Sequence, residues 1–342
     1  MKESQIKNNR IYELDYLRGF ALIGIIFVNI EYLLNLNINY TKIDIFYKTF
    51  LNLFIESKFF AIFSFLFGIG FFIFMRNAKE KKQNKYMLYI RRIIVLGVIG
   101  YLHNLLQPGE ALLLYAIIGF FLIPIFNLNK YINLCVGMLL FIVLLLAGGK
   151  SIMPLPYFIL GCAAAQFNFI VYLKKNALVF KILVIILAFL SIICWWALVK
   201  LNTLPAYSLL ENKSQYLLIK YVESFEKFDE FILLTSPIIA SFYVITLIIL
   251  IQNKNIKKLL YPLKCYGQMA LTNYIGQTIL IIFIGLFIKP SFSFSATFII
   301  CTIILILQIA FSVKWLEIYK YGPLEYAWKY ITYLGNVEKI KR

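Results

Sequence analysis

Residues 231–251 read FILLTSPIIASFYVITLIILI, a continuous apolar run without a charged side chain. A helix of about 20 such residues spans the hydrocarbon core of a bilayer, so this run predicts a transmembrane helix. Further apolar stretches share the pattern, at 19–36, 46–75, 93–107, 111–126, 131–147, 153–173, 178–199, 266–288 and 294–313. The sequence therefore predicts an all-α, polytopic membrane bundle of about ten spans, which forms one domain over residues 1–342.

Composition indicates the same class of protein. Of the 342 residues, 62% are hydrophobic and 15% are charged, and the mean hydropathy is +0.81. A soluble domain averages about 45–50% apolar and about 25% charged residues. So much apolar surface would aggregate in water, which excludes a soluble globular enzyme. The 18% of aromatic residues and the lack of a glycine period exclude a disordered or fibrous chain.

The formal net charge of +18 has a topological explanation. When Lys and Arg are sorted by the alternating ends of the predicted spans, 25 of the 34 fall on one side. Basic loops stay in the cytoplasm, so this side is predicted to be cytoplasmic, with both chain termini on it and an even number of spans. We therefore expect the positive charge to meet membrane lipids and not nucleic acid.

Two segments outside the spans have a distinctive composition. The stretch 200–230 is predicted to be the one long outside loop, either a lid or a plain surface helix. Residues 315–334 are dense in Trp and Tyr with interspersed Lys, which predicts an interfacial helix with Pro323 in its first turn. The five cysteines lack metal-ligand spacing, and the sequence has no Walker loop or HExxH motif, so no metal site is predicted.

Polar residues within apolar spans are costly, and they are therefore the candidate functional groups. His103, the only histidine, lies in the outer half of its predicted span, and Glu110 follows after Pro108-Gly109. A tight hairpin there would fold the Glu110 carboxylate back toward the imidazole and leave the second ring nitrogen free as a general base. We predict His103 and Glu110 as a catalytic pair. The alternative is a histidine bonded to a backbone carbonyl, with Glu110 in water.

The cytoplasmic ends of two spans carry candidate cofactor-binding groups. Arg18 opens the first span, where the alternative is an ordinary arginine that extends to the headgroups. Thr272, Asn273 and Gln277 lie in the inner half of the stretch 266–288, where interhelical hydrogen bonding is the alternative. These four side chains are predicted to line one site at the cytoplasmic side.

Two further side chains are candidate substrate-binding groups. Asn29 lies eleven residues after Arg18, close to the same helical face. Ser64 precedes Gly68-Ile-Gly70, where small residues allow close helix approach, and packing is the alternative reading of this segment.

Several segments together carry a family resemblance. They read RIYELDYLRGFALIGIIFVNI (10–30), KFFAIFSFLFGIGF (58–71), GYLHN (100–104) after Arg91-Arg92, GEALLLYAIIG (109–119), GQMALTNYIGQ (267–277) and GPLEYAW (322–328). This pattern resembles the YeiB-like family of bacterial membrane proteins, a family defined by a domain of unknown function. The family commonly has Asp where Glu110 stands and Arg where Gln268 stands, and the second difference removes a charge that would meet a phosphate.

The YeiB-like family is in turn distantly similar to the transmembrane acyltransferases, which include heparan-alpha-glucosaminide N-acetyltransferase. That resemblance implies a multi-pass protein of the bacterial cytoplasmic membrane. It implies transfer of an acyl group from cytoplasmic acyl-CoA, foremost acetyl-CoA, to an extracytoplasmic glycan or other hydroxyl or amine acceptor. A histidine within the membrane is the implied catalytic residue, and His103 is the candidate here.

These observations lead to a transmembrane acyltransferase as the first hypothesis. Arg18 and the inner amides would hold the CoA phosphates, His103 would act as the base, and Glu110 would orient it. A transporter that uses the same polar cavity for passage is the alternative, and a non-catalytic membrane accessory protein is a third. The sequence leaves the acceptor, the acyl length and homodimer formation open.

Overall fold

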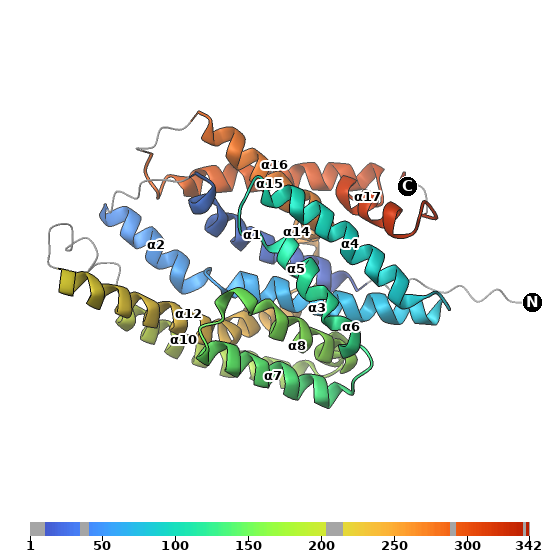
Figure 1. Ribbon diagram of the computed structural model, residues 1–342, viewed down its shortest axis with the longest axis horizontal. Helices are drawn as coiled ribbons and strands as arrows, with labels where there is room; N and C mark the ends of the chain where they lie inside the picture. The colour runs from blue at the N-terminus through green and yellow to red at the C-terminus, as the bar shows by residue number, and fades with distance from the viewer. Residues whose placement is uncertain (1–10, 35–40, 203–214, 288–291, 338–339, 342) are drawn as a thin grey trace, which may run out of the picture.

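The structure is a computed structural model that describes residues 11–34, 41–202, 215–287, 292–337 and 340–341. All named elements in these residues are helices, packed into an elongated bundle (Figure 1). In chain order they are α1 (Tyr12–Leu34), α2 (Lys42–Phe54), α3 (Lys58–Glu80), α4 (Lys85–Asn104), α5 (Ala111–Phe120), α6 (Leu122–Ile125), α7 (Lys130–Leu146), η1 (Lys150–Ile152), α8 (Pro154–Gln166), α9 (Phe169–Lys175), α10 (Ala177–Leu201), α12 (Gln215–Leu250), α13 (Lys254–Leu259), α14 (Tyr261–Gln268), α15 (Ala270–Gly285), α16 (Thr297–Ile318) and α17 (Pro323–Thr332). The all-α prediction is confirmed.

The helices have the length and hydropathy of membrane spans. Among the described residues, 6 helices are long and apolar enough to cross a membrane, and the α14–α15 pair, bent by 85°, raises the number to 7. The helices α5 and α7 are shorter and also apolar. A polytopic membrane protein is thus confirmed, whereas the count of about ten spans and the cytoplasmic position of the termini stay predictions.

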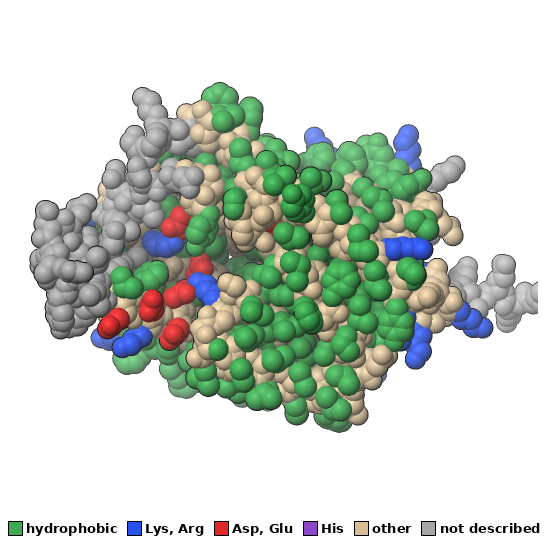
Figure 2. Space-filling view, in the orientation of Figure 1, with side chains coloured by type: hydrophobic (Ala, Val, Ile, Leu, Met, Phe, Trp, Pro, Cys, Tyr) green, Lys and Arg blue, Asp and Glu red, His purple; other side chains and the backbone are tan. Residues whose placement is uncertain are grey.

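The charged side chains gather at the two ends of the bundle. Figure 2 shows a broad hydrophobic band between an end where Lys and Arg predominate and an end where acidic and basic side chains are mixed. We call the first the basic end; it includes the α3–α4 turn with Lys81 and Lys82. The opposite end includes the α4–α5 turn and η1. This separation is typical of a protein that crosses a bilayer.

A close crossing of α1 and α14 shapes the basic end. A Cβ atom on Gly267 would collide with the Asp15 carbonyl oxygen, and one on Gly19 would collide with the Leu263 carbonyl oxygen. Glycine at both positions lets the two backbones touch, as small residues do in membrane helix pairs. The first turns of α1 therefore pack directly against the α14–α15 bend.

Small residues also join α3 to α8. A Cβ atom on Gly68 would collide with the Phe158 carbonyl oxygen, and one on Gly161 with the Phe65 carbonyl oxygen. The expected close approach at Gly68 is confirmed. Gly70 differs, because its added Cβ would lie 3.5 Å from the Arg18 guanidinium, and its missing side chain leaves room for that group.

The two segments outside the predicted spans are largely helical. From Gln215 onward the stretch 200–230 is the first part of α12, so most of its described portion is a helix and not an irregular loop. Residues 203–214 lie outside the described residues. In the stretch 315–334, residues up to Ile318 continue α16, and α17 begins at Pro323 as predicted and runs to Thr332. Its position at the membrane interface stays a prediction.

Candidate functional site

Two cavities lie inside the bundle toward its opposite ends. The Arg18 cavity, of about 380 Å³, lies toward the basic end, and the Glu110 cavity, of about 310 Å³, lies toward the other end. Figure 2 shows a hollow in the surface of the molecule, beside the end where acidic and basic side chains are mixed. Both cavities are of the size that binds small ligands.

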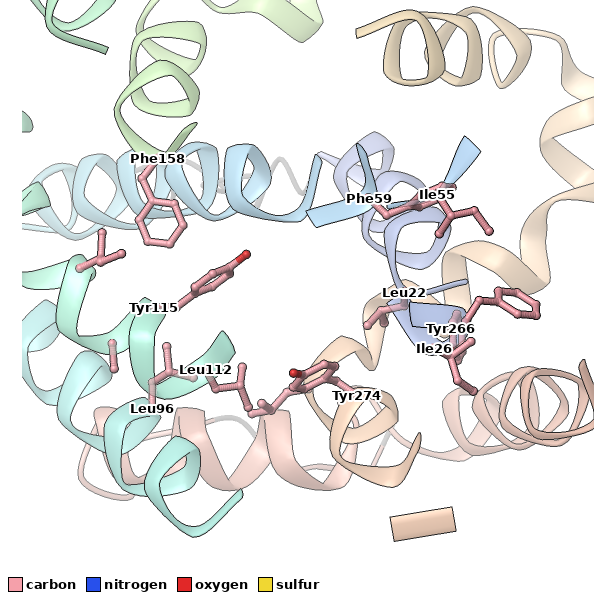
Figure 3. Close-up of a cluster of buried hydrophobic side chains, with 14 of the residues drawn as sticks. Leu22, Ile26, Ile55, Phe59, Leu96, Leu112, Tyr115, Phe158, Tyr266 and Tyr274 are labelled. Atoms are coloured by element: carbon pink, nitrogen blue, oxygen red, sulfur yellow. The ribbon is translucent and has the colours of Figure 1, made fainter. Parts of the chain in front are cut away.

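One thin wall separates the two cavities. Phe63, Leu112, Tyr115 and Tyr274 line both of them, so the wall is a single side chain thick. Figure 3 shows Tyr115 on α5 and Tyr274 on α15, with Leu112 near both. We call these four residues the shared wall.

The Arg18 cavity is lined by three cationic side chains from three helices: Arg18 of α1, Arg92 of α4 and Lys329 of α17. Arg18 pairs with Asp15 at 3.2 Å. Arg92 lies over the Trp328 ring, 3.7 Å from its centroid. No carboxylate within the described residues forms an ion pair with Arg92, so its charge is held by aromatic contacts and is available to an anionic ligand.

Aromatic side chains are the commonest lining residues of the Arg18 cavity: Phe63, Phe67, Phe71, Phe74, Tyr89, Tyr115, Tyr274, Tyr321, Trp328 and Tyr333. Guanidinium groups recognise phosphates, and an aromatic lining favours an apolar chain. The combination fits an elongated ligand with phosphate groups at one end and an apolar arm at the other.

Glu325 holds helix α17 in place along one side of the Arg18 cavity. The Glu325 carboxylate accepts hydrogen bonds from the Leu271 and Thr272 backbone N–H groups, at 2.6 and 3.1 Å, and from the Thr272 hydroxyl at 2.6 Å. These donors begin α15, whose N-cap residue Met269 supplies no capping side chain. Burial raises the pKa of Glu325 above its ordinary value, against the opposing effect of these bonds. Glu325 therefore caps α15 from another helix.

Several polar side chains line the Glu110 cavity. Asn29, Gln107 and Glu110 contribute to its lining together with the shared wall. Glu56 and Lys150 also line it, and Lys150 bonds Asp229 of α12 at 2.7 Å. The rest of the lining is mainly apolar or aromatic. Such a surface suits a ligand with hydroxyl or amine groups and an apolar face.

His103 and Glu110 form a buried pair beside this cavity. The Glu110 carboxylate lies 3.0 Å from His103 Nδ1 and also accepts the Leu112 N–H at 2.6 Å. The predicted fold-back at Pro108-Gly109 is confirmed, because Glu110 is the N-cap of α5 and Gly109 takes a positive φ of 80°. Glu110 lines the cavity, whereas His103 is not among the described lining residues and lies behind it.

The second nitrogen of His103 is not free, in contrast to the expectation. His103 Nε2 lies 2.9 Å from the Thr278 hydroxyl, which itself lies 2.9 Å from the Gln107 amide oxygen. Thr278 has one hydroxyl proton for these two neighbours. Thr278 donates this proton to the Gln107 amide oxygen, so its own oxygen can accept a hydrogen bond from His103 Nε2. Both ring nitrogens of His103 are therefore bonded within the protein.

The candidate residues Arg18 and Asn29 each line one of the two cavities. Arg18 lines a cavity at the N-terminal end of the stretch 266–288, together with Gln268, and Asn29 lines the other cavity. Gln268 occupies the position where the family commonly has arginine, and its amide donates to the Lys320 carbonyl.

Four other candidates are bonded within the protein. The Asn273 amide donates to the Ser312 hydroxyl, and the Gln277 amide donates to the Leu22 carbonyl and the Tyr266 hydroxyl. Thr272 bonds Glu325, and Ser64 bonds the Tyr115 hydroxyl at 2.6 Å. None of these four is among the described lining residues of either cavity, so they support the site only through the groups they hold.

Sequence reasoning missed several residues of the site, among them Arg92, Tyr274, Glu325 and Trp328. Arg92 counted only as a cytoplasmic basic residue. Glu325 and Trp328 belong to the quoted segment 322–328, where an acidic group among apolar and aromatic residues was an unused signal. Tyr274, whose ring lies 5.1 Å from the His103 ring, carried no signal of its own.

The fold and the site define a polytopic helical membrane protein with two opposed cavities. The model of the family described as protein of unknown function (DUF418) matches residues 164–335. The chain belongs to this family. It is similar to an uncharacterized 39.9 kDa protein in the amylase 3' region of Bacillus acidopullulyticus, with 38% identity over 95% of this chain and 94% of the other.

Two further relatives extend the comparison. The uncharacterized protein YxaH of Bacillus subtilis (strain 168) is 25% identical over 96% of both chains. The uncharacterized protein YeiB of Escherichia coli (strain K12) is 37% identical over 22% of this chain and 20% of its own. The YeiB-like resemblance is thus confirmed. No solved structure matches the chain.

Proposed function

We propose that the protein is a multi-pass acyltransferase of the bacterial cytoplasmic membrane. An acyl-CoA, foremost acetyl-CoA, would enter the Arg18 cavity from the cytoplasm. A glycan or another hydroxyl or amine acceptor would enter the Glu110 cavity from the other side. The observation that carries the proposal is the shared wall, because it brings two chemically different cavities within one side chain of each other.

The donor cavity has the groups that a CoA thioester needs. Arg18, Arg92 and Lys329 provide positive charge for phosphates, and the aromatic lining suits the pantetheine arm. The thioester end would then reach the shared wall. Binding energy from the distant phosphates would serve to position the reacting carbonyl.

The acceptor cavity has a proton-accepting pair at the same wall. Glu110 faces the acceptor, and His103 holds the carboxylate through Nδ1. We infer that the pair acts as a unit that takes the proton from the acceptor hydroxyl or amine as it attacks. This assigns His103 the base function predicted from the sequence, with Glu110 nearer to the acceptor.

A transporter is the second candidate function, and the same shared wall favours it. Two cavities on opposite sides of a closed wall are also expected of a carrier between its two open states. The two functions differ in product, because an acyltransferase releases free CoA and a carrier leaves its cargo chemically unchanged.

Binding of CoA to the purified protein tests the donor site. Arg92→Gln is the test variant, and Arg91→Gln is its matched control because Arg91 adjoins Arg92 and lies outside the described lining. One lost charge-assisted hydrogen bond of about 1.5–3 kcal/mol weakens binding roughly 10- to 100-fold. We expect that loss for Arg92→Gln and unchanged affinity for Arg91→Gln. Equal affinities in the two variants would contradict the donor site.

A further inference from the structure

The shared wall is where the two proposed substrates would meet. A transferring carbonyl and its nucleophile must approach to about 3–3.5 Å before reaction. The cavities share Phe63, Leu112, Tyr115 and Tyr274, so the acyl chain would have to occupy space at these side chains. The size of the wall residues then determines which acyl chains fit.

The aromatic members of the wall are held by their neighbours. The Tyr115 hydroxyl bonds Ser64 at 2.6 Å, and its ring packs 6.0 Å from the Phe63 ring, centroid to centroid. The Tyr274 ring packs against the His103 ring, with 5.1 Å between their centroids. These contacts fix the rings, so they cannot easily yield to a longer chain.

Leu112 is the remaining member, and it is aliphatic. Its side chain is 5% exposed and has no hydrogen-bonding atom. Its backbone N–H is bonded to Glu110 in the first turn of α5, so substitution of the side chain leaves that bond in place. Figure 3 shows Leu112 near both tyrosines of the wall.

We propose that Leu112 is the specificity-determining residue for acyl length and restricts the donor to short acyl groups such as acetyl. The inference rests on the proposed function. In the reaction the acceptor oxygen or nitrogen forms a bond to the thioester carbonyl carbon, and the carbon–sulfur bond breaks. The acceptor proton passes to the His103–Glu110 pair and from there to the leaving CoA thiolate. Leu112 takes no part in these steps and fills the volume that further methylene groups would need.

The test compares kcat/KM for acetyl-, butyryl- and hexanoyl-CoA in the full-length protein. Removing Leu112 side-chain volume should favour the longer donors by about tenfold or more, the scale on which apolar pockets discriminate chain lengths. We expect wild type to prefer acetyl-CoA and Leu112→Ala to lose or reverse this preference. Ile118→Ala is the matched control, because Ile118 is buried on the same helix and outside the described lining, and it should keep the wild-type preference.

A second variant, Leu112→Phe, keeps the test decisive if Leu112→Ala fails to fold. Leu112→Phe adds volume and should depress turnover of butyryl-CoA below the wild-type value. An unchanged chain-length profile in both variants, with CoA binding and acetyl transfer retained, overturns the assignment of Leu112 and leaves the proposed function standing. Failure of wild type to turn over any acyl-CoA refutes the proposed function, and the role of Leu112 falls with it.

Discussion

Glu325→Ala removes the carboxylate that caps α15 from α17, and the structure sets the expected cost. Three hydrogen bonds to a charged group are lost, from the Leu271 N–H, the Thr272 N–H and the Thr272 hydroxyl. Each such bond contributes about 1.5–3 kcal/mol and a helix cap about 0.5–2 kcal/mol, but the three serve one cap and do not add. We expect a loss of about 2–4 kcal/mol in the free energy of unfolding.

Thermal unfolding of the purified protein in detergent is the assay. At about 1.5 °C per kcal/mol for a chain of this length, the midpoint Tm should fall by roughly 3–6 °C in Glu325→Ala. Glu317→Ala is the control, because Glu317 is an exposed residue of α16 and its loss should leave Tm unchanged. A Glu325→Ala protein that melts within about 1 °C of wild type would refute the capping role.

Glu325 also makes the stability of the folded protein depend on pH. Burial raises the pKa of Glu325 in the folded protein. Stability that arises from the neutral carboxyl is then fully present below the unfolded pKa of about 4.3 and is lost as the pH rises through the raised folded pKa. Glu325→Gln is neutral at every pH and keeps an acceptor oxygen. Its Tm relative to wild type should therefore increase as the pH rises, and a constant difference would contradict the raised pKa.

Three further predictions concern topology, chemistry and packing. Cysteines introduced at Gln83 and Ser151 should react with membrane-impermeant thiol reagents from opposite sides of the membrane, and the one at Gln83 should react from the cytoplasm. Labelling of both from the same side would exclude the charge-based topology. His103→Gln and Glu110→Gln should each lower acyl transfer by about 10²–10⁴-fold, and the double variant should be no slower than the slower single one. Additive losses would show that the pair does not act as a unit. Gly68→Val should abolish folding or lower Tm strongly, because its side chain meets the Phe158 backbone of α8, and a wild-type Tm would contradict this packing.

The membrane class and much of the helical organisation could be predicted from the sequence. Apolar runs such as 231–251 mark helices by their length, and Pro323 correctly marked the start of α17. The His103–Glu110 contact was also predictable, since Pro108-Gly109 forces a tight turn between the two residues. These features depend on residues close together in the chain.

The parts of the site that sequence reasoning missed depend on contacts between distant segments. Asn273 and Gln277 looked like ligand-binding amides, yet α1 and α16 pack against α15 and supply their partners. Arg92 was interpreted only as a topology signal, because the sequence does not reveal that Trp328, far along the chain, packs on its guanidinium. The first part of α12 was predicted as a loop or surface helix, because its mixed charge obscures its continuity with the apolar run that follows.

The most direct test of the central claim is release of free CoA from acetyl-CoA by the purified full-length protein. The reaction contains glucosamine and other sugars with hydroxyl or amine groups as probe acceptors, and wild type is compared with His103→Gln. We predict release above the protein-free rate in wild type, reduced about 10²–10⁴-fold in His103→Gln at equal CoA affinity. Absence of both acetyl-CoA binding and CoA release in wild type, or equal release by the two proteins, would contradict the account.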